Sequence, residues 1–215
     1  MIRLAVSVEG RTEEEFVKTL IAEHLSPVGV DVTPVLVGSA RNRGKGGNVS
    51  AAVLVGDMRL LSHNFDAVTS LVDFYGFRGR EGRTVDELVA DLSEELRDQI
   101  GPAARPDHVV PYVQLHEFEG LLFSRPEAFR TVPGATEESV AKLRDVRARF
   151  PSPEDINDSA TTAPSKRLLE ALPRYWKTVD GLRVAGRIGL DGIRRECARF
   201  NAWLAALEAL GGAER

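Results

Sequence analysis

The chain has 215 residues, 43% of them hydrophobic, and carries 28 Lys+Arg against 32 Asp+Glu for a formal net charge of −4. This composition is typical of a globular protein and argues against a disulfide-stapled mini-protein or a long disordered tail. A single cysteine leaves no intrachain disulfide and no cysteine zinc site. No run reaches the roughly 18 apolar residues of a membrane span. The chain start lacks a signal-peptide pattern, so we expect a cytoplasmic protein with no membrane contact.

Four apolar segments predict strands. They cover Ile2 to Val8, Val30 to Val37, Ala67 to Val72 and Val109 to Leu115, and the first and third are expected to be buried. Pro34 lacks a backbone N–H and therefore indicates an edge or irregular position for the second strand.

Helical patterns lie between these strands. Thr12 with Glu15, and Thr84 with Glu87, have the spacing of a capping box, and Asn48 can cap a helix that ends near residue 62. Strands that alternate with helices of this length form right-handed crossovers. The sequence therefore predicts an α/β fold with a mainly parallel four-stranded sheet flanked by helices.

The strand pattern stops after about residue 125. Thr136 and Ser152 look like helix starts, and Asp191 can cap a last helix that buries Cys197 on its apolar face. We expect an α/β core over residues 1–124 and a helical C-terminal extension over residues 125–215, packed as one compact unit.

Acidic residues follow three of the predicted strands. Glu9, Asp73 and the pair Glu117 and Glu119 all fall at C-terminal strand ends, where open α/β sheets bind ligands. Carboxylates gathered at one edge repel each other unless a cation or a shared proton intervenes. Oxygen ligands of this kind suit Mg²⁺ or Mn²⁺ and phosphoryl chemistry. The alternative is that these are solvated loop acids or charges at helix N-termini.

The segment VEGRTE at residues 8–13 resembles the opening of Toprim-like domains, and LVDFY at 71–75 resembles their strand-terminal aspartate motif. Nearly end to end, the chain resembles a bacterial family known as domain of unknown function 4276. The blocks that carry this resemblance are QLHEFEGLLF at 114–123, IND at 156–158, APSKRL at 163–168 and the stretch from Ile188 to Trp203.

The Toprim resemblance implies four parallel strands and a Mg²⁺ site for phosphodiester cleavage. Glu9 matches the family glutamate, as metal ligand or general acid/base, and Asp73 matches the first aspartate. Tyr75 stands where a second aspartate is usual. We expect a replacement ligand among Glu13, Glu117 and Glu119, or else a one-metal site or one completed by a partner.

Further residues are candidates for contact with substrate. His116 is a ligand, a general base or a structural histidine. Lys166, Arg167 and Lys177 could offset phosphate charge, although solvated helix starts often carry such residues. The glycine-rich loop from Gly38 to Gly47 lacks the phosphate-loop motif, and we interpret it as a basic flap or an ordinary surface loop. Its basic residues are Arg41, Arg43 and Lys45.

The leading hypothesis is a Mg²⁺ or Mn²⁺-dependent DNA or RNA nuclease with Glu9, Asp73, His116 and Lys166 as catalytic residues. By resemblance to the Toprim nucleases of OLD-type systems, it would act with a separate ABC-type ATPase in anti-phage defence. The alternatives are a non-catalytic module that binds nucleic acid or protein, and a hydrolase of small phosphate compounds. The sequence leaves open whether the protein forms a homodimer.

The charge is unevenly distributed. Residues 165–200 hold nine Lys+Arg and four acids, a net charge of +5, so the rest of the chain carries −9. This split leaves room for a local phosphate-binding surface, although chance clustering on solvated helices is the alternative.

Overall fold

The computed structural model describes residues 1–38, 49–101, 105–157 and 162–212. They form two compact units. The first comprises residues 1–114 together with the C-terminal residues from Trp203 onward, and the second comprises Leu115–Ala202. The boundary expected after residue 124 falls inside the second unit.

The first unit is an α/β unit, as its alternating sequence pattern predicts. Its elements are β1 (Ile2–Val8), α1 (Arg11–Phe16), η1 (Val17–Ile21), α2 (Ala22–Leu25), η2 (Ser26–Val28), β2 (Val30–Leu36), α4 (Ala51–Leu61), β3 (Ala67–Asp73), α5 (Val85–Ile100), η3 (Pro106–His108), β4 (Val109–Val110) and β5 (Val113–Gln114). The last helix, α11 (Ala198–Gly212), begins in the second unit and ends in the first.

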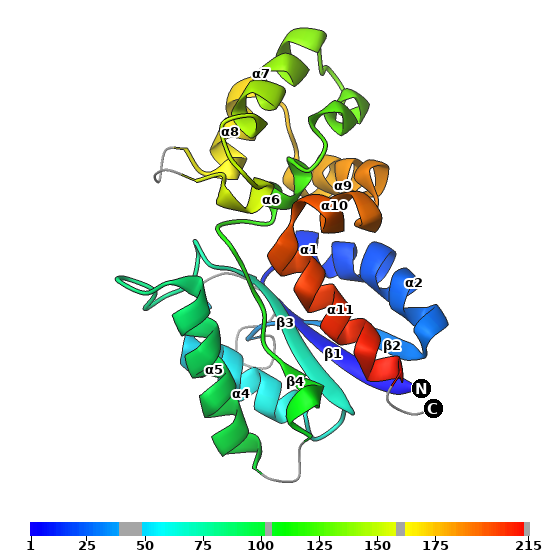
Figure 1. Ribbon diagram of the computed structural model, residues 1–215, viewed down its shortest axis with the longest axis vertical. Helices are drawn as coiled ribbons and strands as arrows, with labels where there is room; N and C mark the ends of the chain where they lie inside the picture. The colour runs from blue at the N-terminus through cyan, green and yellow to red at the C-terminus, as the bar shows by residue number, and fades with distance from the viewer. Residues whose placement is uncertain (39–48, 102–104, 158–161, 213–215) are drawn as a thin grey trace. The chain divides into compact units, whose positions relative to one another are not determined.

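The sheet of the first unit is parallel throughout, with the order β2-β1-β3-β4 and with β5 also paired to β3. Helices α4 and α5 cover one face, and α1, α2 and the C-terminal part of α11 cover the other (Figure 1). Strand β1 is central and buried at every position except Arg3, because its apolar residues face helices on both sides. The expected α/β class is confirmed.

Prolines shape both edges of this sheet. Pro34 lies in the edge strand β2, paired with Val6, as its missing N–H requires. The predicted fourth strand is split into β4 and β5, and Pro111 lies in the gap. The hydroxyl of Ser70 bridges this gap: it donates to the Tyr112 carbonyl at 2.8 Å and accepts from the Tyr112 N–H at 2.9 Å.

Helix α11 is fixed to the sheet through Trp203. The indole N–H of Trp203 donates to Thr69 Oγ1 at 2.8 Å. Its ring stacks on Tyr112 with centroids 4.8 Å apart and planes 15° apart. Farther along the helix, Gly211 approaches the Val28 carbonyl so closely that no Cβ would fit. The C-terminal helix is therefore an integral layer of the α/β unit.

Several helix starts follow the predicted cap chemistry. Thr84 and Glu87 form the predicted capping box, Thr136 forms one with Ser139, and Ser152 caps a short 3₁₀ turn. The box predicted at Thr12 is wrong. Helix α1 has Gly10 as its N-cap residue with no side-chain cap, and Thr12 is buried inside its first turn.

The second unit is helical, as expected for the C-terminal part of the chain. Its elements, besides the start of α11, are α6 (Glu119–Leu122), η4 (Pro126–Thr131), α7 (Glu137–Arg147), η5 (Pro153–Asp155), α8 (Pro164–Ala171), η6 (Lys177–Gly181), α9 (Leu182–Ile188) and α10 (Leu190–Glu196). No strand occurs among the residues described here between Leu115 and Ala202.

The single last helix predicted from Asp191 is wrong, because the chain leaves helical geometry at Cys197, with φ −119° and ψ 90°. A new helix then begins, and the buried carboxylate of Glu154 caps it by accepting from the N–H groups of Arg199 and Phe200 at 3.0 and 3.1 Å. Cys197 is fully buried, as predicted. Burial raises the pKa of its thiol to about 12.

No helix of the described part of the chain is both long and apolar enough to cross a membrane.

The contacts of Trp203 predict a measurable cost for its loss. Trp203→Phe removes the indole hydrogen bond and part of the stacking area, so the free energy of unfolding in urea should fall by about 1–3 kcal/mol. Trp176, whose side chain is 66% exposed, provides the matched control. Trp176→Phe should change the same quantity by less than about 0.5 kcal/mol. Equal losses would contradict the role given to Trp203.

Candidate functional site

Two of the predicted site residues meet at the C-terminal edge of the sheet. β1 and β3 are neighbours with Val8 opposite Leu71, so Glu9 and Asp73 leave the sheet on adjacent central strands. The carboxylate of Glu9 accepts a hydrogen bond from the Asp73 backbone N–H at 3.2 Å. This bond fixes the Glu9 carboxylate at the end of β3, where parallel α/β sheets bind ligands.

Two glycines leave room for the carboxylates of Glu9 and Glu13 close to the backbone. A Cβ at Gly76 would come 3.1 Å from Glu9 Oε1, and one at Gly10 would come 3.0 Å from Glu13 Oε2. The Glu13 side chain is buried in the first turn of α1. Side chains at the two glycine positions would displace carboxylate oxygens, so the glycines keep the positions of Glu9 and Glu13.

A basic residue that the sequence interpretation missed lies in the loop after β3. The guanidinium of Arg80 packs over the rings of Phe74 and Tyr75, at 5.6 and 5.0 Å from their centroids. Its Nε also donates to the Tyr75 carbonyl at 3.0 Å. Tyr75, the residue in place of a second aspartate, thus holds the guanidinium group of Arg80. The basic, glycine-containing stretch FRGR at residues 77–80, four residues after the end of β3, was the available sequence signal.

The remaining predicted acids belong to the second unit, where each has a partner. Glu117 accepts from the backbone N–H of Ser165 at 2.9 Å and pairs with its hydroxyl at 3.1 Å. Because Ser165 lies in the first turn of α8, the Glu117 carboxylate serves as an N-terminal cap for that helix. A structural function therefore accounts for Glu117.

Glu119 is the most deeply buried acid among the predicted site residues, with 1% of its surface exposed. Its Oε2 lies 3.2 Å from the ammonium of Lys177, whose side chain is 41% exposed. Burial raises the pKa of the Glu119 carboxyl above its ordinary value, Lys177 opposes that shift and Glu117 adds to it. Lys177, predicted to contact substrate, is here the partner of Glu119.

His116 has an unusual backbone. With φ at 65°, it is the one residue other than glycine that has a positive φ in the described segments. Its Nδ1 lies 3.1 Å from Nδ2 of Asn157, a partner the sequence interpretation missed. The Asn157 amide group therefore lies within hydrogen-bond distance of the His116 ring. Strained backbone conformations gather at functional sites, which keeps His116 a candidate.

The basic candidates differ in their surroundings. Lys166 is exposed on α8. Arg167 packs over the Phe150 ring, with its guanidinium carbon 5.3 Å from the centroid, and its Nε donates to the Thr162 carbonyl at 2.7 Å. The loop residues Arg41, Arg43 and Lys45, and the helix cap predicted at Asn48, lie outside the described residues.

Glu9 and Asp73 have the chemistry that a hard divalent cation requires. Mg²⁺ sites in proteins use one or two carboxylates and complete their octahedron with water and substrate phosphate oxygens. Within the described ranges, no group of three or more His, Cys, Asp or Glu side chains is arranged to hold a metal ion. A two-carboxylate site falls below that number, so these residues fit a Mg²⁺ or Mn²⁺ ion held largely by water and substrate.

Glu119 and Glu117 predict opposite effects on stability when their charge is removed. Because the folded-state pKa of Glu119 is raised, folding disfavours its ionised form, and stability is lost as the pH rises above the ordinary glutamate value of about 4.3. Glu119→Gln should therefore gain stability relative to the wild type as the pH rises from 5 to 8. Chemical unfolding across this range measures the effect.

Glu117→Gln is the matched control for this experiment. It weakens the cap of α8 and should lower the free energy of unfolding by about 0.5–1 kcal/mol at neutral pH. A Glu119→Gln variant that loses as much stability as Glu117→Gln, with no trend in pH, would contradict the burial argument.

Comparison with known proteins gives one match. The family model described as Domain of unknown function (DUF4276) matches residues 8–208, which cover the second unit, most of the first unit and every candidate residue above. Neither the curated proteins nor the solved structures contain a match to this sequence. The chain belongs to the DUF4276 family.

Proposed function

We propose that this protein is a Mg²⁺ or Mn²⁺-dependent phosphodiesterase that acts on DNA or RNA, with Glu9 and Asp73 as the metal ligands. One observation carries the proposal: the Glu9 carboxylate accepts a hydrogen bond from the backbone N–H of Asp73 at the C-terminal edge of two adjacent central strands. Two acids on adjacent strand ends repel each other, and a cation between them offsets that repulsion.

The residues of the chain would divide the work as follows. Glu9 and Asp73 would hold the cation, whose chemistry is Lewis-acid polarisation of a phosphoryl oxygen. Arg80, held over Phe74 and Tyr75 in the loop that follows β3, supplies positive charge suited to a substrate phosphate. Glu117 and Glu119 have partners within their own unit, so the proposed ligand set does not include them.

The wider assignment extends this proposal by resemblance. The segments around Glu9 and Asp73 resemble Toprim-like nuclease domains, and related nucleases act with a separate ABC-type ATPase in anti-phage defence. We keep both the Toprim relationship and the ATPase partner as parts of the proposal. An increase in the ATPase activity of such a partner, when this protein and DNA are added to it, would support the partnership.

A second candidate function is a non-catalytic module that binds nucleic acid or protein. The observation in its favour is that Tyr75, in place of a second acid, anchors Arg80 with its ring and its carbonyl. Under this alternative, millimolar Mn²⁺ would leave the melting temperature unchanged. Under the metal-site proposal, Mn²⁺ raises it in the wild type and not in Asp73→Asn, because a ligand that binds only the folded state stabilises it.

Nicking of supercoiled plasmid in Mn²⁺, with a parallel assay on single-stranded RNA, tests the activity. Glu9→Gln and Asp73→Asn should each reduce cleavage by about 100-fold or more, the usual effect of removing a group that stabilises the transition state. Glu81→Gln, which removes an exposed acid from the same loop region, is the matched control and should cleave like the wild type. Equal cleavage by all four proteins would reject the assignment, and a protein that cleaves neither substrate and is not stabilised by Mn²⁺ would favour the module.

A further inference from the structure

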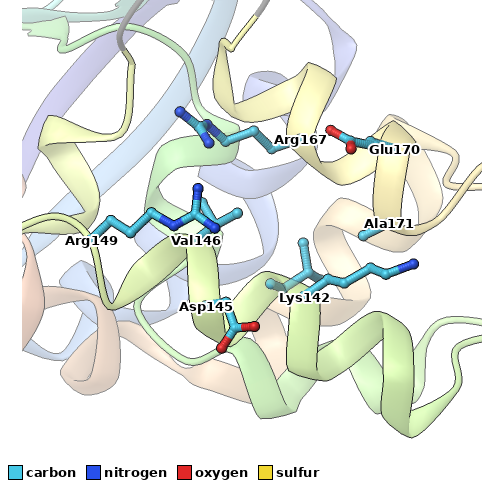
Figure 2. Close-up of a pocket in the computed structure, with 8 residues that line it drawn as sticks. Lys142, Asp145, Val146, Arg149, Arg167, Glu170 and Ala171 are labelled. Atoms are coloured by element: carbon cyan, nitrogen blue, oxygen red, sulfur yellow. The ribbon is translucent and has the colours of Figure 1, made fainter.

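The second unit contains a charged cavity that the proposed metal site does not use. It lies between α7 and α8 and has a volume of about 250 Å³. Leu143, Val146 and Ala171 contribute its apolar walls, and Arg149 and Arg167 contribute guanidinium groups. Figure 2 shows both guanidinium groups on the same side of the cavity, Arg149 beside Val146 and Arg167 extending from α8.

Arg167 is held in a fixed orientation. One face of its guanidinium packs on the Phe150 ring, and its Nε donates to the Thr162 carbonyl at 2.7 Å. A guanidinium oriented in this way loses little conformational entropy when it binds an oxyanion, and its planar set of N–H donors matches phosphate geometry.

Arg149 differs from the arginines of α7. Arg144 pairs with Glu127 at 3.0 Å and Arg147 pairs with Glu196 at 2.7 Å. Across the described part of the chain, the Arg149 side chain makes no hydrogen bond or ion pair. The cavity is thus bordered by Arg149, whose charge no acid of the described residues neutralises, and by Arg167, whose guanidinium is already oriented.

One of the two acids of the cavity, Asp145, lies away from the two arginines. In Figure 2, the carboxylate of Asp145 points away from both guanidinium groups, and Lys142 extends toward the opposite side. Lys142 pairs with Glu138 at 2.9 Å. The other acid, Glu170, lies on α8, the helix that also carries Arg167. The arginine side therefore attracts an anion, and a volume of about 250 Å³ accommodates a small oxyanion or a phosphate ester better than a large ligand.

We propose that Arg149 and Arg167 form a phosphate-binding site in this cavity. The bound group is a phosphate, either that of a small phosphate compound or one in the backbone of a nucleic-acid strand. The second source rests on the proposed nuclease function. The site itself does not, because binding of phosphate at this cavity requires neither metal nor cleavage.

Two binding measurements in EDTA test this site. The first is the melting temperature in millimolar inorganic phosphate against chloride at equal ionic strength, and the second is the affinity for a short fluorescent single-stranded DNA, measured by anisotropy at several salt concentrations. Phosphate should raise the melting temperature of the wild type. For DNA, Arg149→Gln should weaken binding by about 10-fold, and the salt slope should fall by about 1.

Arg144→Gln is the matched control, since it removes the same charge five residues earlier in the chain, at an arginine of α7 that is already paired with Glu127. Arg149→Lys keeps the charge without the planar fork and should recover only part of the affinity. Both measurements are made in EDTA and need no bound metal, so failure of the metal site and failure of this cavity give different results.

The outcomes separate cleanly. Loss of both the phosphate effect and the DNA affinity in Arg149→Gln places a strand phosphate in the cavity. Loss of the phosphate effect alone assigns the cavity to small phosphate compounds. If Arg149→Gln behaves like Arg144→Gln in both assays, or if phosphate and chloride stabilise the wild type equally and DNA binding is unchanged, the cavity does not bind phosphate.

Discussion

The parallel pairing of β1 with β3 is the constraint on which the candidate site depends. It aligns Val8 with Leu71, so Glu9, directly after β1, and Asp73, the last residue of β3, emerge at the same edge of the sheet. The hydrogen bond from the Asp73 N–H to Glu9 then fixes one carboxylate against the end of the neighbouring strand. Gly76 is part of the same arrangement, because any side chain there would press on Glu9. A sheet in another strand order would separate these groups.

The fold could be predicted where a local pattern has one physical solution. The short apolar runs at residues 2–8 and 67–73 form buried strands, and the run at 30–36 forms the edge strand that Pro34 indicates. Thr84 and Thr136 act as the helix caps that their sequences indicate. Errors arose where tertiary contacts decided the outcome. Thr12 is buried inside its helix instead of capping it, and the backbone turns at Cys197 because Glu154, distant in sequence, caps the next helix.

The site was harder to predict, because sequence shows which residue types follow a strand and not which partners they find. Glu9 and Asp73 were identified from strand ends and meet there. Glu117 and Glu119 were chosen by the same criterion, yet one caps α8 and the other pairs with Lys177. Arg80 and Asn157 were missed, since a stacking or hydrogen-bonding partner across a loop leaves no periodic signal. Buried acids that anchor helices and acids that hold a cation look alike in a sequence.

The distribution of charge connects the two proposed sites. The proposed cation site of Glu9 and Asp73 and the proposed phosphate site of Arg149 and Arg167 would each supply one component of metal-dependent phosphodiester chemistry. The most direct test of the central claim is the anomalous difference density of crystals soaked in Mn²⁺. The account predicts a manganese peak coordinated by Glu9 and Asp73 that disappears in Asp73→Asn. A soaked crystal with no peak at these two carboxylates, or one whose peak persists in Asp73→Asn, would contradict it.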